Sequence, residues 1–139
     1  MSIERAELER LLESAVAAAA ASWSPYSRFP VGAALAAADG SVVTGTNVEN
    51  RSYGLTICAE RAAVCTAVGR SLRDIRAVAV YCAAADGPVP PCGACRQVLT
   101  EFCPPETPVI YTGRDRSRVV VTTLGALLPA DSLHDLGRG

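Results

Sequence analysis

Residues 58–82 read CAERAAVCTAVGRSLRDIRAVAVYC and place an expected helix directly before an expected buried strand. Ala59 to Val68 is apolar at helical spacing, and Gly69 is predicted to follow the helix end, where glycine tolerates a left-handed backbone. Ala77 to Cys82 is an apolar run of strand length. A helix that leads into a buried strand favours the α/β class.

The chain on both sides of this stretch continues to alternate helices and strands. Apolar residues recur every three or four positions over residues 4–21, which predicts an amphipathic helix, and Asp39-Gly40 is typical of a hairpin turn. The other expected elements are strands over Val31–Ala38, Val42–Asn47, Val109–Tyr111 and Val119–Val121, a Gly/Pro loop over 83–91, and helices over Gly93–Phe102 and Leu124–Leu127. The order α-β-β-α-β-α-β-β-α predicts a three-layer α/β/α sandwich with one mixed sheet of about five strands. We expect a single domain over residues 1–139.

The composition excludes several classes of protein. Half of the 139 residues are hydrophobic and 19% are charged, which is too apolar for a disordered chain. No apolar stretch is long enough to cross a bilayer and the N-terminus lacks a signal-peptide pattern, so we expect a cytoplasmic protein with no membrane partner. With a net charge of −1, a nucleic acid polymer is a disfavoured partner. All 13 basic residues are arginines, which excludes chemistry that needs a lysine amine.

Six cysteines are the compositional anomaly of the chain. In a reducing compartment, clustered cysteines more often bind metal than form disulfides. Cys58, Cys92 and Cys95 offer three thiolates to one tetrahedral Zn²⁺ per chain and leave its fourth position open for water, as in catalytic zinc sites. The other three lie among apolar neighbours and are expected to be small buried side chains: Cys65, Cys82 and Cys103. The only histidine, His134, is expected to be a surface residue.

Two residues that follow Cys58 are suited to assist such a metal centre. Both cysteine groups are expected where a loop enters a helix, and the positive end of a helix favours thiolate. Arg61, one turn after Cys58, is positioned to hydrogen-bond a ligand sulfur. Glu60 is the predicted catalytic proton carrier, because hydrolysis by a zinc-bound hydroxide needs a nearby group that delivers protons to the substrate and to the leaving group. The alternative for Glu60 is to complement the helix dipole.

The cysteine motifs resemble the signature of the zinc nucleobase deaminases. Over nearly its whole length the chain is similar to the small homotetrameric cytidine deaminases. The free-nucleoside branch is indicated by Tyr26-Ser27-Arg28-Phe29-Pro30-Val31-Gly32-Ala33-Ala34 and by Asn47-Val48-Glu49-Asn50 with Tyr53. This resemblance implies hydrolytic deamination of cytidine and deoxycytidine to uridine and deoxyuridine with release of ammonia, in pyrimidine salvage. It also implies a small-molecule nucleoside substrate and a homotetramer with active sites near subunit interfaces.

The same resemblance implies which residues contact the substrate. It assigns the ribose hydroxyls to Asn47 and Glu49, packing against the pyrimidine to Phe29, and a backbone contact with the base to Ala59. An amide and a carboxylate together donate to and accept from sugar hydroxyls, and an aromatic ring buries a flat base. Taken singly, each residue also has a merely structural explanation: Asn47 and Glu49 could end a strand, and Phe29 could belong to the core.

The chain departs from the family pattern at two places. Arg51 stands where the family commonly has a small residue near a subunit contact. Leu127-Leu128-Pro129-Ala130-Asp131-Ser132-Leu133 lacks the phenylalanine that usually follows Leu-Leu-Pro and reaches into a neighbouring active site. We expect one face of the bound pyrimidine to be more open or covered by another group, such as Leu133, which would raise the KM for cytidine and admit substituted cytosines.

Other functions remain open from the sequence. A deaminase of a modified cytosine nucleoside, such as a blasticidin-type antibiotic, would share the chemistry. A polynucleotide editor is disfavoured by charge. A non-catalytic zinc-stabilised binding domain has no need of an open coordination position beside a glutamate, and a redox role for Cys92-x-x-Cys95 would leave Cys58 and Glu60 unexplained.

Overall fold

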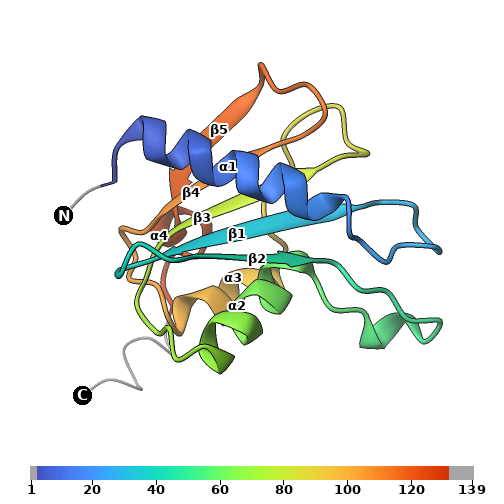
Figure 1. Ribbon diagram of the computed structural model, residues 1–139, viewed down its shortest axis with the longest axis horizontal. Helices are drawn as coiled ribbons and strands as arrows, with labels where there is room; N and C mark the ends of the chain where they lie inside the picture. The colour runs from blue at the N-terminus through green and yellow to red at the C-terminus, as the bar shows by residue number, and fades with distance from the viewer. Residues whose placement is uncertain (1–2, 132–139) are drawn as a thin grey trace.

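Figure 1 shows the computed structural model of the chain, which describes residues 3–131. The predicted order of helices and strands is confirmed, with an additional 3₁₀ turn at Tyr53–Leu55. The helices are α1 (Arg5–Ala19), α2 (Ala59–Gly69), α3 (Gly93–Thr100) and α4 (Leu124–Leu127), and the strands are β1 (Val31–Ala37), β2 (Val42–Thr46), β3 (Ile75–Cys82), β4 (Pro108–Thr112) and β5 (Val119–Thr123). Within residues 3–131, no helix combines the length and apolar character needed to cross a bilayer.

The five strands form one mixed sheet in the order β2-β1-β3-β4-β5. Strand β1 pairs antiparallel with both β2 and β3, the β3–β4 pair is parallel, and β5 runs antiparallel to β4. The β1–β2 hairpin turns at the predicted dipeptide: Gly40 has a φ of +91°, and the Asp39 carboxylate accepts a hydrogen bond of 2.8 Å from the Ser41 amide. Because parallel strands need a crossover connection, α3 lies between β3 and β4 in the chain.

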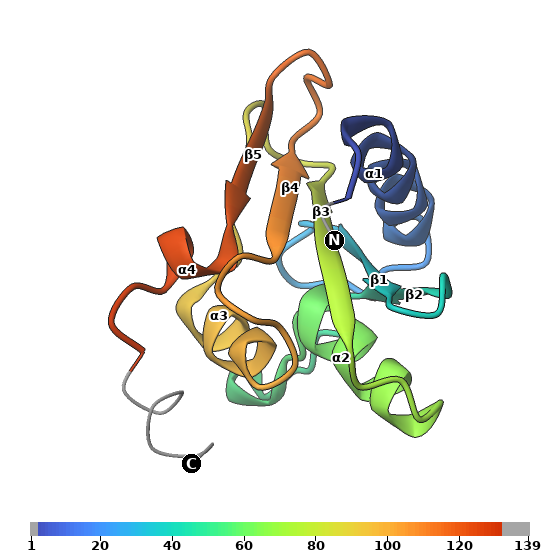
Figure 2. The same cartoon turned by 90° about the vertical axis from the view of Figure 1, so that its left-hand side faces the viewer.

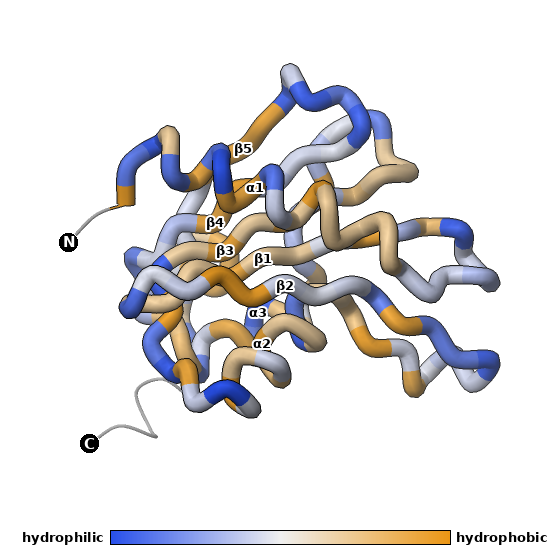
Figure 3. The backbone as a smooth tube through the Cα atoms, viewed as in Figure 1, coloured by the Kyte–Doolittle hydropathy of each residue, from blue (hydrophilic) through white to orange (hydrophobic). Residues whose placement is uncertain are grey.

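Alternate residues of the sheet are buried on opposite faces, which produces the predicted three layers. On one face Ala34, Ala79 and Ile110 pack against α1. On the other face Leu35 and Val78 belong to the cluster that includes α2 and α3. Figure 2 shows α1 on one side of the sheet and α2 and α3 on the other. In Figure 3 the strands are mainly apolar, whereas the loop after β4 is hydrophilic.

Two glycines allow the helices to approach the sheet closely. A Cβ at Gly32 would lie 1.9 Å from the Ala15 carbonyl oxygen of α1, so only glycine allows this close packing. A Cβ at Gly45 would lie 2.5 Å from both the Ala59 carbonyl oxygen and the Ala63 nitrogen of α2. Gly45 on β2 therefore determines how near the first turn of α2 sits to the sheet.

The prediction that Gly69 follows the end of α2 is wrong. Gly69 is the last helical residue, and Ser71 takes the left-handed conformation with a φ of +63°. The Ser71 amide donates to the Val68 carbonyl and the Leu72 amide to the Ala67 carbonyl, which are the two hydrogen bonds of a Schellman motif. These bonds satisfy the last carbonyls of α2 and compensate for a left-handed non-glycine residue.

Gly45→Ala should lower the free energy of unfolding by about 1–3 kcal/mol, because overpacking forces the backbone of α2 away from the sheet. Urea unfolding of both proteins measures the difference. Gly69→Ala is the matched control, since no atom lies within 4 Å of its added Cβ. Equal stability of Gly45→Ala and the unaltered protein would contradict the role assigned to Gly45.

Candidate active site

The structure brings the three predicted zinc ligands together at the starts of two helices. Cys58 is the N-cap residue of α2 and Cys92 that of α3, and neither side chain caps its helix. The Sγ atom of Cys92 lies 3.9 Å from that of Cys58 and 3.4 Å from that of Cys95, and all three sulfurs lie within 4.8 Å of one another. Three thiolates about 2.3 Å from a tetrahedral zinc ion would be separated by roughly 3.8 Å, so the cluster fits this metal.

Arg61 contacts the thiol cluster. Its Nη2 atom donates a hydrogen bond of 3.2 Å to the Sγ atom of Cys58. The pKa of Cys58 is lowered to about 5, mainly by its hydrogen bond with Cys95 and further by the hydrogen bond and positive charge of Arg61. A guanidinium on a ligand sulfur withdraws negative charge from it, and three thiolates on one zinc ion carry more negative charge than the ion neutralises.

Glu60 is a buried carboxyl group beside the thiol cluster. It lies in the first turn of α2 and is only 4% exposed. Burial raises the pKa of Glu60 to about 7, and the neighbouring Cys58 adds to the rise. A carboxyl group that titrates near neutrality takes up and releases protons readily at the pH of the cell. Complementing the helix dipole would require no such burial.

A cavity of 340 Å³ lies directly over these groups. Its walls include all four residues that were predicted to contact substrate: Phe29, Asn47, Glu49 and Ala59. They also include Glu60, two of the zinc-ligand cysteines and apolar residues of β3 and of the 83–91 loop: Cys58, Cys92, Val80, Cys82, Val89 and Pro90. The cavity therefore combines a metal site, a buried acid and an apolar wall, as expected of an enzyme that takes a small ring.

Asn47 is buried and connects three segments of the chain near the cavity. Its Oδ1 atom accepts hydrogen bonds from the Ser22 hydroxyl at 2.5 Å and from the Val31 amide at 2.9 Å. Its Nδ2 atom donates to the Phe29 carbonyl at 2.9 Å. Because both acceptor positions are occupied and one N–H is used, Asn47 has one amide hydrogen left for a ligand.

Glu49 holds the turn that leads to Phe29. Its carboxylate accepts hydrogen bonds from the Tyr26 and Ser27 amides at 3.0 and 3.1 Å, and from the Ser27 hydroxyl. The Ser27 hydroxyl also accepts a bond of 3.0 Å from the Phe29 amide. Arg28, between them, has a left-handed φ of +55° and reverses the chain so that Phe29 enters the cavity wall.

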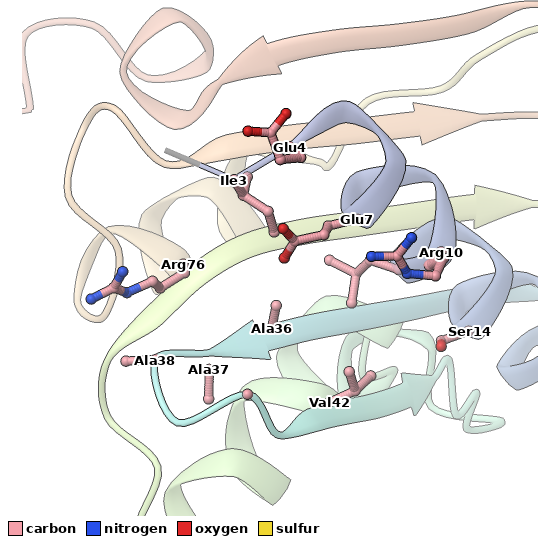
Figure 4. Close-up of a pocket in the computed structure, with 12 residues that line it drawn as sticks. Ile3, Glu4, Glu7, Arg10, Ser14, Ala36, Ala37, Ala38, Val42 and Arg76 are labelled. Atoms are coloured by element: carbon pink, nitrogen blue, oxygen red, sulfur yellow. The ribbon is translucent and has the colours of Figure 1, made fainter. Parts of the chain in front are cut away.

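A second groove, of 740 Å³, is separate from this cavity. Figure 4 shows it between α1 and the β1–β2 hairpin, with Glu7 and Arg10 of α1 and Arg76 of β3 among its residues. No cysteine lines it, and none of the residues predicted for the active site does. We therefore place the chemistry in the smaller cavity.

Comparison with known proteins identifies the family. The model of the cytidine and deoxycytidylate deaminase zinc-binding region matches residues 5–111. The chain belongs to this family. A curated cytidine deaminase of Halalkalibacterium halodurans is 50% identical over 131 residues, covering 91% of this chain and 98% of the relative. One of Mycobacterium tuberculosis is 49% identical over 127 residues, covering 90% of each chain. The crystal structure of cytidine deaminase from Burkholderia pseudomallei matches with a TM-score of 0.83 and 46% identity, over 88% of this chain and 96% of that one.

Of the three remaining cysteines, two are buried as predicted and one is not. Cys82 and Cys103 are buried, as predicted, and burial raises the pKa of each thiol to about 12. Cys65 is exposed, so the prediction that it is buried is wrong: it lies on the outer face of α2, next to the buried Val64. The expected roles of Leu133 and His134 fall on residues outside the described range 3–131.

Sequence reasoning missed several side chains that contribute to the site. Cys82 was assigned only to the core, yet it also lines the cavity. Ser22 and Ser27 hold Asn47 and Glu49, although a serine in a loop carries no signal of such a role. Arg96 donates to the Pro91 carbonyl at 2.7 Å and to the Leu127 carbonyl at 2.8 Å, and its place directly after Cys95 could have suggested it.

Proposed function

We propose that this deaminase converts cytidine and deoxycytidine to uridine and deoxyuridine with release of ammonia, in pyrimidine salvage. The observation that carries the proposal is that Glu60, two of the three clustered thiols and the Phe29 ring meet in one cavity. The curated relatives that bear the name cytidine deaminase support it, because they match almost the whole chain.

Zinc held by the three thiolates of Cys58, Cys92 and Cys95 would supply a Lewis acid that activates water for attack on the ring carbon bearing the amino group. Glu60 takes a proton from the attacking water at its carboxylate and delivers it to the ring nitrogen. The same carboxylate then takes the remaining proton from the hydroxyl added to the ring carbon and passes it to the amine, which leaves as ammonia while that carbon becomes a carbonyl, so that one buried side chain serves both transfers. Arg61 holds Cys58 and draws negative charge from its sulfur.

The other cavity residues orient the nucleoside. Phe29 and Val89 form apolar walls for the flat pyrimidine. Asn47 presents a single remaining N–H and therefore donates to a sugar oxygen, whereas the Glu49 carboxylate accepts from a sugar hydroxyl. A donor and an acceptor side by side match a ribose hydroxyl, which has one hydrogen and two lone pairs.

We infer that the enzyme acts as a homotetramer with its active sites near subunit interfaces. Large apolar side chains are exposed in the segment that follows Glu49 and at Trp23, whose backbone pairs with Asn47 and Glu49: Trp23 is 58% exposed, Tyr53 74% and Leu55 65%. Exposed apolar side chains grouped in this way are typical of surfaces that meet another protein chain. We place this assembly in the cytoplasm, with each chain forming one catalytic domain.

The proposed reaction is tested with the purified, zinc-loaded protein. Ammonia and uridine should be released from cytidine in equal amounts, and deoxycytidine should react similarly. A blasticidin-type nucleoside and a cytosine-containing single-stranded oligonucleotide are the comparison substrates. Turnover of either of these in preference to cytidine, or of none of the four compounds, would overturn the proposal.

Glu49→Gln should raise the KM for cytidine about tenfold with little change in kcat, because a neutral amide accepts a sugar hydroxyl less strongly than a carboxylate does. Steady-state kinetics measure both constants. Glu106→Gln removes an exposed carboxylate from a different face and is the control. An unchanged KM in Glu49→Gln would remove Glu49 from the sugar site.

A further inference from the structure

We propose that the loop between β4 and β5, Gly113–Arg118, positions the cavity wall and the metal ligand Cys92 from a distance. This loop supplies no residue to the cavity. It lies against the 83–91 loop, which leads from the end of β3 to Cys92 and contributes Val89 and Pro90 to the cavity wall. The inference rests on the zinc site and on cytidine as the substrate.

Two backbone hydrogen bonds and one ion pair join the two loops. The Arg114 amide donates to the Ala85 carbonyl at 2.7 Å, and the Asp115 amide donates to the Asp86 carbonyl at 3.1 Å. The Arg114 side chain forms an ion pair with Asp86. These contacts hold the 83–91 loop at its tip. At its other end the Ala83 amide donates to the Pro30 carbonyl at 3.1 Å, beside Phe29.

Two glycines show how closely the loops pack. A Cβ at Gly113 would lie 2.3 Å from the Gly87 carbonyl oxygen and 2.6 Å from that of Ala85, so only glycine fits there without moving the backbone. A Cβ at Gly87 would lie 2.9 Å from an Arg118 guanidinium nitrogen. Gly113 is buried, and it therefore determines the separation of the two loops.

The segment between Gly87 and Cys92 transmits position because prolines stiffen it. It reads Pro88-Val89-Pro90-Pro91, and each proline ring restricts φ to a narrow range around −65°. Pro91 is buried, and its carbonyl accepts the hydrogen bond from Arg96 of α3. A shift imposed at Gly87 therefore reaches Val89, Pro90 and the thiol of Cys92 instead of being absorbed by flexible residues between them.

Gly113→Ala is the direct test. We expect kcat/KM for cytidine to fall about tenfold to a hundredfold, because a displacement of the order of 1 Å at a reacting site has effects of this size. Transfer of zinc from the protein to a chromogenic chelator should also become faster, and this readout does not depend on turnover. Gly69→Ala is the control for an unhindered glycine, and Gly125→Ala is the control for crowding elsewhere, since its Cβ would lie 3.0 Å from Pro105.

The melting temperature separates positioning from general stability. If Gly113→Ala melts lower but its zinc-loaded folded fraction shows normal kcat/KM and normal zinc release, the proposal is overturned. Gly87→Ala provides a test that does not depend on folding of the first variant, because the three atoms nearest to its added methyl group all belong to the guanidinium of Arg118. Because the exposed, flexible Arg118 side chain can partly move aside, we expect Gly87→Ala to lose less kcat/KM than Gly113→Ala, and we expect the double variant Gly87→Ala with Arg118→Ala to recover. Failure of this rescue would also count against the proposal. Absence of cytidine turnover in the unaltered protein would instead refute the proposed function.

Discussion

Glu60→Gln should reduce kcat for cytidine by about a hundredfold to ten-thousandfold while one zinc ion per chain is retained. The amide keeps the size of the buried side chain but cannot take up a proton from water and pass it to the ring. Glu60 is not a zinc ligand in the proposed site, so its replacement leaves the three thiols in place. An assay of the ammonia released after fixed reaction times measures the rate, and metal analysis measures the zinc content of the protein.

Binding of a ligand that the enzyme does not convert is the control for Glu60→Gln. Uridine, the product, should bind the variant about as tightly as the unaltered enzyme, because Phe29, Asn47 and Glu49 are unchanged. Turnover within a few-fold of the unaltered enzyme would show that another group moves the protons and that Glu60 only complements the dipole of α2.

Cys92→Ala should abolish stoichiometric zinc binding and, with it, measurable deamination. Two thiols hold zinc far less strongly than three. Without the metal, the two remaining thiols lie next to the buried Glu60 with no ion between them. Metal analysis after gel filtration measures the zinc, and thermal melting measures the accompanying loss of stability. We expect the same result for Cys58→Ala and Cys95→Ala.

Cys65→Ala is the matched control for the cysteine variants. Cys65 lies on the same helix as Cys58, but its thiol is exposed and outside the metal cluster. This variant should keep zinc, activity and melting temperature. A Cys92→Ala protein with one tightly bound zinc ion per chain and normal turnover would show that the zinc site has been wrongly assigned.

The sequence predicted the local structure well because each local signal has a local cause. The Asp39-Gly40 turn, the amphipathic α1 and the alternation of helices with apolar strands depend on neighbours in the chain. The prediction failed at Gly69 because a helix end also depends on what the following residues contact. There Ser71 adopts the left-handed conformation and the Leu72 amide closes the motif.

The cysteines show the same difference between features that depend on chain neighbours and features that depend on tertiary packing. Cys58, Cys92 and Cys95 could be grouped from spacing, because a Cys-x-x-Cys pair at a helix start and a single cysteine at another are a recognisable ligand set. Cys65 has equally apolar neighbours but is exposed. Cys65 is exposed and Val64 is buried because of which face α2 turns toward the sheet, and that orientation is a property of the packed fold.

The sequence by itself determined the class of fold, the candidate metal ligands and the acid beside them, since these follow from hydrophobic period and from residue chemistry at short spacing. Spacing and residue chemistry could not link Phe29 and Glu49, far from the cysteines in the chain, to this site. Only the family resemblance implied the link, and the tertiary structure decided it by placing both residues in the wall of the cavity that holds Glu60. It also decided that Gly113 packs against Gly87. These contacts arise from strand order and from close approach of distant backbones, which no run of neighbouring residues encodes.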